Sequence, residues 1–546
     1  MTYDVVVVGS GSAGSAVAAR LSEDPGVRVL LLEAGPVPAT DDAFPEEVRD
    51  GATLRASVPG HPLNWSYLGH LTPDLPYTIA RGRVLGGSSA INGGYFVRAR
   101  PEDFDAWAAA GNPEWAYERV LPALRDLEHD LDHRGTEVHG GAGPMPVRRA
   151  PQRNPAARAF TAAAHELGFP AEPDKNAPGP PGVGPIPLNV VAGVRRSTGM
   201  QYVNPVRHRP NLEVRGHALV LRIRFDGARA VGVEVATDAG TEAITAGQVV
   251  LAAGAIGSPH LLLRSGVGPA AELAAHGVPV VADVAGVGRD FSDHPDLTVG
   301  WRSRRDVVAR RPESFVTALN LSSPDGPPQG DLEILLCVRP LSMLLTGEGA
   351  GRLSTVRAGL RAGLSHPARL VGALRGVSFR RLARQAAHAR DLMLLVGLQA
   401  PVSRGRITLV SADPAVHPRI DYHHLAEPAD RERMRYGLRT AVAVLRSRAF
   451  ERLFGGLTEL DDATLADDAA LDAWMLGHLG TAIHLCGSAR MGPADDLGAV
   501  VDQYGRVHGV SGLRVADTSI LPTVPSRGPA ATAVLVGELV ARFMRG

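Results

Sequence analysis

The sequence predicts an α/β fold that begins with a Rossmann-like dinucleotide-binding unit. An apolar, β-branched run at residues 4–8 is typical of a strand buried on both faces of a parallel sheet. A glycine-rich turn follows it at once, and an alanine-rich helix is expected over residues 15–22. A second apolar strand, over residues 27–32, ends in Glu33. Strand, turn, helix and strand in this order predict a βαβ unit.

The turn Gly9-Ser-Gly-Ser-Ala-Gly14 has the spacing of a dinucleotide-binding loop. Gly9 permits the tight turn, Gly11 lets the backbone approach a pyrophosphate, and Gly14 lets the helix pack closely on the strand. The helix N-terminus attracts phosphate, and Glu33 is placed to accept hydrogen bonds from ribose hydroxyls. An acid there argues against NADP, whereas FAD and NAD both remain open. The loop residues that we expect beside the ligand are Gly9, Gly11, Ser12, Ala13, Gly14, Glu33 and Ala34.

The composition is that of a globular protein without an electrostatic reason to bind nucleic acid. Of 546 residues, 45% are hydrophobic and 21% charged, and the formal net charge is zero. Only two cysteines, Cys337 and Cys486, favour a reducing compartment. With no signal-peptide pattern and no apolar run of about 20 residues, we expect a cytoplasmic protein. No group of residues has zinc-site spacing, so no metal is expected.

Four later segments resemble the signature stretches of the glucose–methanol–choline (GMC) oxidoreductases and occur in the same order as in that family. They are residues 81–98 (RGRVLGGSSAINGGYFVR), 254–269 (GAIGSPHLLLRSGVGP), 484–492 (HLCGSARMG) and 512–522 (GLRVADTSILP). The resemblance implies a Rossmann-like FAD-binding domain interleaved with an α+β substrate domain built on an antiparallel sheet. It assigns residues 1–40, 75–110, 195–300 and 481–546 to the first domain, and 111–194 and 301–480 to the second. Strands of the substrate sheet are expected at 331–338, 392–399 and 405–409.

The resemblance also implies which residues hold the flavin. The glycine–serine loop would wrap the pyrophosphate, and Asn92 would lie beside the isoalloxazine ring. Asp517 would bind the ribityl or phosphate region, although it could equally be a loop-capping aspartate. Ile91 stands where members with covalently attached FAD have histidine, so noncovalent FAD is expected. The flavin-binding positions implied in this way are Arg81, Val84, Gly86, Gly87, Ser88, Asn92, Gly93, Gly94, Val220, Ala253, Gly254, Asp517, Ala530 and Ala531.

His484 matches the catalytic histidine of the family. Oxidation of an alcohol removes a proton from the hydroxyl and a hydride from the carbon, and histidine suits the role of base near neutral pH. The hydride would go to flavin N5. By contrast, we interpret His294, in the segment Asp293-His-Pro295, as structural.

The chain departs from the family at the second catalytic position. The loop after the C-terminal strand reads PSRGPAAT and contains neither histidine nor asparagine. The position that matches the family's histidine or asparagine falls near residues 528–530, and Ala530 gives the best alignment. His484 could act alone, Arg527 could supply the charge, or a donor could come from the substrate domain. Arg527 could instead be a structural partner of a carboxylate.

Several alternatives for the reaction stay open. Short matches around residues 91–96, 484–489 and 526–532 resemble flavin dehydrogenases that accompany mycofactocin, which implies oxidation of reduced mycofactocin and electron transfer to a membrane-associated respiratory acceptor. A small-alcohol or choline-type oxidase or dehydrogenase is the second possibility, and a cyanohydrin lyase is a third, from another class. A redox-inactive flavin-binding scaffold is the fourth.

Residues 341–390 read as a basic, arginine-rich insert. A basic amphipathic helix could bind the inner face of a membrane peripherally, whereas the alternative is a solvated basic lid or loop.

Overall fold

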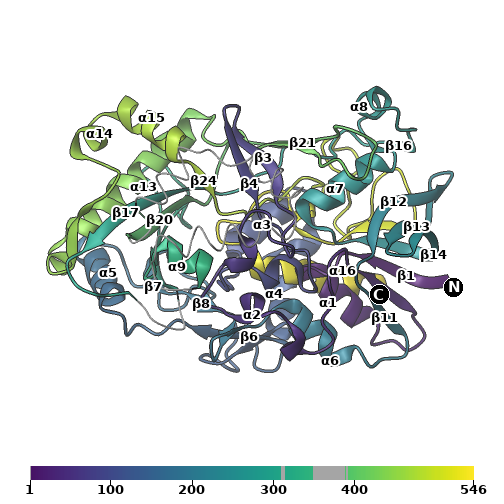
Figure 1. The fold of residues 1–546 in the computed structure, drawn as a ribbon, viewed down its shortest axis with the longest axis horizontal. Helices are drawn as coiled ribbons and strands as arrows, with labels where there is room; N and C mark the ends of the chain where they lie inside the picture. The colour runs from purple at the N-terminus through teal and green to yellow at the C-terminus, as the bar shows by residue number, and fades with distance from the viewer. Residues whose placement is uncertain (1, 309–313, 348–387, 389–390) are drawn as a thin grey trace.

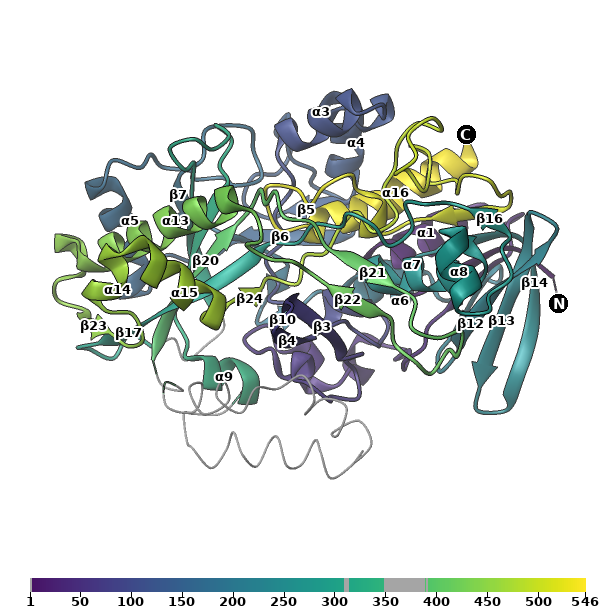
Figure 2. The ribbon, with the colours of Figure 1, turned by 90° about the horizontal axis from the view of Figure 1, so that it is seen from above.

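The computed structural model describes residues 2–308, 314–347, 388 and 391–546. In this part the chain forms two lobes, each built on a seven-stranded sheet. Figure 1 shows the first lobe on the right and the second on the left, and both termini belong to the first lobe, as Figure 2 also shows.

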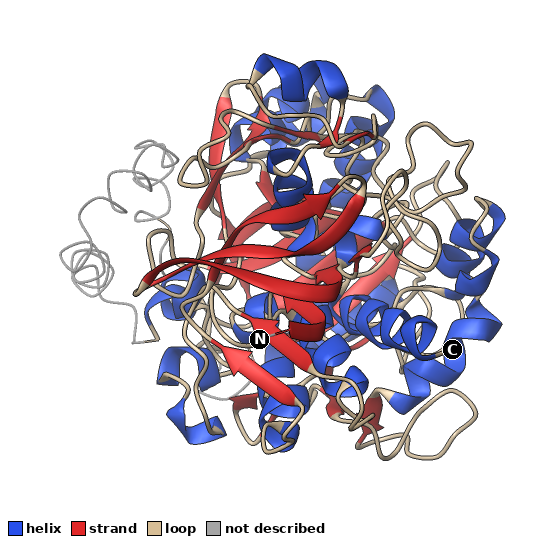
Figure 3. Ribbon diagram, turned by 90° about the vertical axis from the view of Figure 1, so that its right-hand side faces the viewer, coloured by secondary structure: helices blue, strands red, loops and turns tan. Residues whose placement is uncertain are grey.

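The first sheet contains the predicted βαβ unit. Strand β1 (Thr2–Val8) pairs in parallel with β2 (Val29–Leu32), and α1 (Ser12–Leu21) connects them. On its other side β1 pairs in parallel with β14 (Gly240–Leu251), so β1 is central and buried, as its apolar sequence predicts. The sheet is completed by β11 (Leu212–Arg215), β12 (Leu219–Asp226), β13 (Arg229–Thr237) and β25 (Leu513–Val515). Figure 3 shows strands of this sheet in front, with helices beside them.

Helix α1 is packed closely on both sides. A Cβ atom on Gly14 would lie 2.0 Å from the carbonyl oxygen of Gly9, so only glycine lets the helix approach the strand end. Helix α16 (Ala530–Arg545) packs on α1, and a Cβ atom on Gly537 would lie 2.3 Å from the carbonyl oxygen of Ala13. The glycines therefore set the position of the α1 N-terminus, where the ligand loop begins.

The second sheet is antiparallel throughout. Its strands, in spatial order, are β23 (Phe454–Leu457), β17 (Pro295–Ser303), β20 (Leu392–Leu398), β19 (Leu332–Cys337), β18 (Phe315–Leu321) and β7 (Val183–Pro185), with β24 (Gly480–Thr481) paired to β17. Helices α13 (Pro428–Arg446) and α5 (Pro155–Glu166) pack against it. The antiparallel sheet predicted from the resemblance is therefore present, and β19 and β20 correspond to the strands expected at 331–338 and 392–399.

Two details of the expected second domain need correction. The strand expected at residues 405–409 exists as β21 (Arg406–Thr408), but it belongs to a separate four-stranded sheet with β22 (Arg419–Asp421), β3 (Tyr67–Thr72) and β4 (Leu75–Ile79). In addition, the boundary expected at residue 300 falls inside β17, which pairs with the second sheet along its whole length. An apolar run predicts that a strand exists, but its partner is decided by tertiary contacts.

Shorter elements complete the fold. The remaining helices that we name are α2 (Glu46–Arg49), α3 (Pro101–Ala109), α4 (Tyr117–Asp126), α6 (Asn204–Val206), α7 (Gly254–Arg264), α8 (Ala270–Ala275), α9 (Leu341–Thr346), α14 (Asp462–Ala466) and α15 (Asp468–His478). The remaining strands are β5 (Glu128–Asp130), β6 (Met145–Arg149), β8 (Pro187–Leu188), β9 (Val190–Val191), β10 (Val194–Arg195), β15 (Val267–Gly268) and β16 (Ala282–Asp283).

The basic insert predicted at residues 341–390 lies outside the described residues except for α9 and a few neighbours. Among the described helices, none is long and apolar enough to cross a bilayer.

Candidate active site

A cavity of about 450 Å³ opens between the two lobes. Its walls come from the end of β1, the start of α1, β2, β12 and α7 of the first lobe, and from β19 of the second. Two C-terminal segments, residues 482–485 and 528–530, and Ala533 complete it. The cavity therefore joins the predicted dinucleotide loop to the predicted catalytic histidine.

One end of the cavity has the features of a phosphate and ribose site. A Cβ atom on Gly11 would meet only the carbonyl oxygen of Ala252, at 3.9 Å, and one on Gly254 would meet nothing within 4 Å, so both backbones lie open to a ligand. No side chain caps the N-terminus of α1, which leaves its amides free for an anion. Glu33 is held by the Ser10 hydroxyl at 2.6 Å and also lines this end. These residues fit the pyrophosphate and ribose of FAD.

The glycine–serine loop forms a second wall. Its Gly87–Ala90 segment is a short 3-10 helix, and the Ser88 hydroxyl oxygen accepts a hydrogen bond from the Gly82 amide at 3.2 Å. The carboxamide oxygen of Asn92 accepts one from the Gly94 amide at 3.0 Å. Both side chains thus shape the loop from within while they line the cavity.

Most of the predicted site residues reach the cavity wall. Those that line it are Gly9, Gly11, Ser12, Ala13, Glu33, Ala34, Arg81, Gly87, Ser88, Asn92, Gly93, Val220, Ala253, Gly254, His484, Asp517 and Ala530. Those that the structure does not bring to the wall are Gly14, Val84, Gly86, Gly94, Arg527 and Ala531.

Asp517 lines the cavity but is bound by the protein. Its Oδ2 accepts hydrogen bonds from the Gly254 amide at 2.9 Å and the Ser258 hydroxyl at 2.5 Å, and its Oδ1 accepts one from the Ser519 amide at 2.9 Å. The side chain therefore fixes the turn that presents Gly254, as the loop-capping alternative requires.

His484 is paired with His294, a residue that the sequence analysis interpreted as structural. Their Nδ1 atoms lie 2.9 Å apart, and His294 Nε2 lies 3.0 Å from the carbonyl oxygen of Pro525. A carbonyl only accepts, so His294 carries its hydrogen on Nε2 and presents a bare Nδ1 to His484. His484 must then donate from Nδ1, which leaves its Nε2 unprotonated and available as a base.

Burial keeps both imidazoles neutral. It lowers the pKa of His294 to about 3, and it lowers the pKa of His484 well below 6.5, with smaller contributions from His294 and Arg81 in the same direction. His484 keeps partial exposure because one edge opens on the cavity. At neutral pH its side chain is therefore a neutral proton acceptor.

The backbone amides of both histidines donate hydrogen bonds to the same buried side chain, that of Asp293. Asp293 Oδ1 accepts the amide of His294 at 2.7 Å and that of His484 at 2.6 Å. Ile483 has a positive φ of 63°, which is a strained conformation for a β-branched residue, and Arg81 Nη1 donates to its carbonyl at 2.9 Å. Strain that is held by several hydrogen bonds is typical of a functional site.

Ala530, the residue predicted to stand at the second catalytic position, lines the cavity, whereas Arg527 does not. Ala530 is the first residue of α16 and lines the cavity near Gly528, whose Cβ position is 3.6 Å from His484 Nε2. Arg527 is fully buried behind this wall, with Nη2 3.4 Å from Glu172 Oε1. This geometry is that of the structural carboxylate partner.

Two wall residues were not predicted as site residues, although one of them, Tyr95, lies within the signature stretch 81–98. Tyr95 Oη donates to Glu333 Oε2 at 3.1 Å, and both side chains line the cavity. Glu333 comes from an apolar strand, where a single acid gives little sequence signal. Elsewhere the wall includes the aromatic residues Trp65 and Tyr67, whose rings stack at 5.9 Å, and His417.

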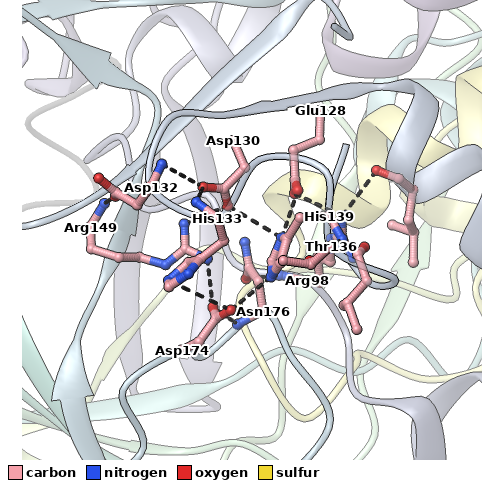
Figure 4. A network of polar contacts seen from close by, with 12 residues as sticks. Arg98, Glu128, Asp130, Asp132, His133, Thr136, His139, Arg149, Asp174 and Asn176 are labelled. Atoms are coloured by element: carbon pink, nitrogen blue, oxygen red, sulfur yellow. Dashed lines mark hydrogen bonds and ion pairs between the residues drawn. The ribbon is translucent and has the colours of Figure 1, made fainter. Parts of the chain in front are cut away.

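Among the described residues, one group could hold a metal ion, and it lies outside this cavity. Glu128, Asp130 and His139 offer ligand atoms within 4.8 Å of one another. Figure 4 shows that arginines already occupy the same carboxylates: Arg98 Nη2 lies 2.8 Å from Glu128 Oε2, and Arg149 Nη1 lies 2.6 Å from Asp130 Oδ2. The group is therefore an ion network in this structure.

His139 is the cation at the centre of that network. Its Nδ1 lies 2.8 Å from Glu128 Oε1 and its Nε2 lies 2.7 Å from Asp174 Oδ2, so both nitrogens donate and the ring is an imidazolium. Although burial opposes the charge, these two carboxylates raise the pKa of His139 to about 9. The network links β5 to residues 139 and 174.

Comparisons with known proteins point to one enzyme family. Models of the GMC oxidoreductase family match residues 3–296 and 401–537. An uncharacterized GMC-type oxidoreductase of Rhodococcus erythropolis is 41% identical over 100% of this chain and 98% of its own length, and a Burkholderia pseudomallei protein named oxygen-dependent choline dehydrogenase is 36% identical, with 100% and 94% covered. Pyridoxine 4-oxidase from Mesorbium loti superposes with a TM-score of 0.84 at 29% identity, with 99% of this chain and 98% of that chain covered.

Proposed function

Because the chain belongs to the GMC oxidoreductase family, and is thus an FAD-dependent oxidoreductase acting on CH–OH donors, we propose that it oxidises an alcohol with His484 as the general base. The observation that carries this proposal is the tautomer of His484. Its Nδ1 is hydrogen-bonded to Nδ1 of His294, and its side chain lines the cavity. The neutral Nε2 can accept the hydroxyl proton, a contribution typically worth about 10²–10⁴-fold in rate.

FAD would bind along the glycine-lined wall, with Glu33 at its ribose and the α1 N-terminus at its pyrophosphate. When bound, it supplies the acceptor for the hydride that leaves the alcohol carbon. Ile91, a hydrocarbon side chain on the same wall, offers no atom for covalent attachment, which supports noncovalent binding.

The protein's own residues then handle one proton. His484 takes it at Nε2 and becomes an imidazolium, while His294 keeps the Nδ1–H in place through its bare Nδ1. With alanine at position 530, the substrate oxygen lacks one side-chain donor that the family resemblance led us to expect. In this proposal His484 is the one residue to which a role at the substrate oxygen is assigned.

The alcohol is a small molecule or reduced mycofactocin. Relatives named choline dehydrogenase and pyridoxine 4-oxidase favour a small alcohol. The short resemblances at residues 91–96, 484–489 and 526–532 favour mycofactocin, with electrons then passing to a respiratory acceptor.

Anaerobic stopped-flow spectroscopy of the holoprotein tests the proposal. Choline, simple primary alcohols and reduced mycofactocin are mixed separately with the enzyme, and loss of the flavin's visible absorbance is followed. His484→Ala should slow this reduction at least about 100-fold while FAD stays bound. Equal reduction by the variant would exclude the base role, and no bleaching by any alcohol would favour the lyase or scaffold alternatives. Fast reoxidation by air separates an oxidase from a dehydrogenase.

A further inference from the structure

The carboxyl group of Asp293 contacts both members of the histidine pair, but these contacts use only one of its oxygens. Asp293 is 2% exposed, and its Oδ1 accepts the backbone amides of His294 and His484 at 2.7 and 2.6 Å. Its Oδ2 is also buried and has no hydrogen-bond partner among the described residues. Because burying an unpartnered polar atom costs free energy, holding two amides does not account for the whole side chain.

Burial disfavours the charged form of this carboxyl group. It raises the pKa of Asp293 to about 7, although Arg81, both histidine amides and the Thr481 hydroxyl act in the opposite direction. Arg81 Nη1 is itself occupied by the carbonyl oxygens of Ala80 at 3.1 Å and Ile483 at 2.9 Å, and in the described part of the chain Arg81 forms no ion pair with Asp293. The carboxyl group can therefore lose its proton in the neutral pH range without a direct counter-charge.

Two further groups that face Asp293 remain neutral. Burial and, second to it, the charge of Asp293 raise the pKa of the Tyr422 hydroxyl and of the Cys486 thiol well above their ordinary values. His294 carries no charge either, because burial lowers its pKa to about 3. Of the groups around Asp293, His484 is thus the one whose charge changes in the proposed reaction.

Proton transfer to His484 creates a positive charge close to this carboxyl group. The His484 ring begins three bonds from the amide nitrogen that Asp293 Oδ1 contacts at 2.6 Å. The two charged groups therefore lie within the range of about 4–6 Å over which an opposite charge shifts a pKa by about 1–3 units. A carboxylate at Asp293 would make His484 a stronger base, whereas the neutral acid would not.

We propose that Asp293 tunes the basicity of His484: as a carboxylate it stabilises the imidazolium that forms when the alcohol gives up its proton, and as a neutral acid it does not. Asp293 is then a positioning residue, because it acts through His484 and does not line the cavity. The alcohol proton passes from the hydroxyl oxygen to His484 Nε2, and the proton of Asp293 is lost to solvent beforehand. The inference rests on the proposed function for the reaction itself, but the basicity of His484 can be measured without an alcohol.

The first experiment follows anaerobic flavin reduction in the holoenzyme from about pH 5 to 9, about two units on either side of the pKa of Asp293. The substrate is whichever of choline and the simple primary alcohols bleaches the flavin, at a saturating concentration. We expect the wild-type rate to rise about 3- to 30-fold across a step near pH 7, because only part of the shift in basicity reaches the rate. Asp293→Asn keeps an oxygen for both amides but cannot ionise, so its rate should stay at the lower level without the step.

The second experiment needs no alcohol. Diethyl pyrocarbonate acylates the bare nitrogen of a neutral imidazole, so its rate of reaction at His484 reports the basicity of Nε2. The modification of His484 in the holoprotein is followed by mass spectrometry of the peptide that contains it, over the same pH range. The wild-type rate should rise through the same step near pH 7, and the Asp293→Asn rate should not.

Asp430→Asn is the matched control. Asp430 is also completely buried, and its carboxylate accepts the amides of Val402 at 2.9 Å and Ser403 at 2.8 Å, but it lies on α13 of the second lobe. This variant should keep both pH steps even if its melting temperature falls. Asp293→Glu keeps an ionisable group and should retain a step at a shifted midpoint, and it takes the place of Asp293→Asn if that variant does not fold. The FAD content and melting temperature of each variant report its folding.

A wild-type profile without the step, in flavin reduction or in the modification of His484, overturns the inference. An Asp293→Asn variant that keeps the step does so too, as does an Asp293→Glu variant whose step stays at the wild-type midpoint. If no alcohol bleaches the flavin, the proposed function fails, and the modification rates of His484 alone decide the role of Asp293.

Discussion

Replacing His294 tests whether one histidine sets the tautomer of the other. In His294→Leu, the His484 Nδ1–H loses the acceptor that lies 2.9 Å away. A buried donor without a partner costs about 1–3 kcal/mol, and each factor of ten in rate corresponds to about 1.4 kcal/mol. We therefore expect flavin reduction to slow about 5- to 150-fold. His294→Asn, which keeps an acceptor near the Nδ1 position, should recover most of the rate.

The pH profile distinguishes positioning from mere support of the fold. His484 must be neutral to act, so the rate falls as pH drops through its pKa, which burial places well below 6.5. His294 contributes to that lowering, so its removal should move the acid limb to higher pH. Anaerobic reduction rates from pH 4.5 to 8 would show the shift, because this range begins about two units below the ordinary histidine pKa of about 6.5.

A matched control is His424→Leu. His424 is equally buried, and burial lowers its pKa to about 3 as well, but no described hydrogen bond joins it to His484. The reasoning is refuted if His294→Leu keeps the wild-type acid limb and reduces the flavin within about twofold of wild type, or if His424→Leu shifts the limb just as much.

Three further predictions follow from the same contacts. Gly11→Val would put a side chain into the open space beside the Gly11 backbone. We expect the purified variant to lack FAD but to unfold cooperatively on heating. A normal FAD-to-protein ratio would contradict the placement of FAD at Gly11. Because the pKa of His139 is raised to about 9, the stability that this residue contributes is complete below about pH 6.5 and is lost as pH rises through 9. The free energy of unfolding, measured with denaturant, should therefore fall by about 1–3 kcal/mol between pH 7 and 10. The His139→Gln variant should not show this fall. Ala530→Asn would add a donor to the cavity wall and should speed flavin reduction about 10-fold or more; an unchanged rate would mean that the substrate oxygen does not lie there.

The sequence by itself determined the parts of this protein that depend on local pattern. The apolar run, the glycine spacing and Glu33 are neighbours in sequence, so the βαβ unit and its ligand end follow from about thirty residues. His484 and the alanine at position 530 were found in the same way, because each lies in a short segment with a recognisable order of residue types.

Only the tertiary structure decided which side chains meet. His294 and His484 are 190 residues apart, and Tyr95 and Glu333 are 238 apart, so no periodicity or spacing could pair them. Arg527 is three residues from Ala530 in sequence, yet the fold buries it against Glu172. The assignment of β21 to its sheet and the protonation of both histidines were decided likewise, because strand partners, burial and hydrogen-bond acceptors come from segments that the chain brings together only on folding.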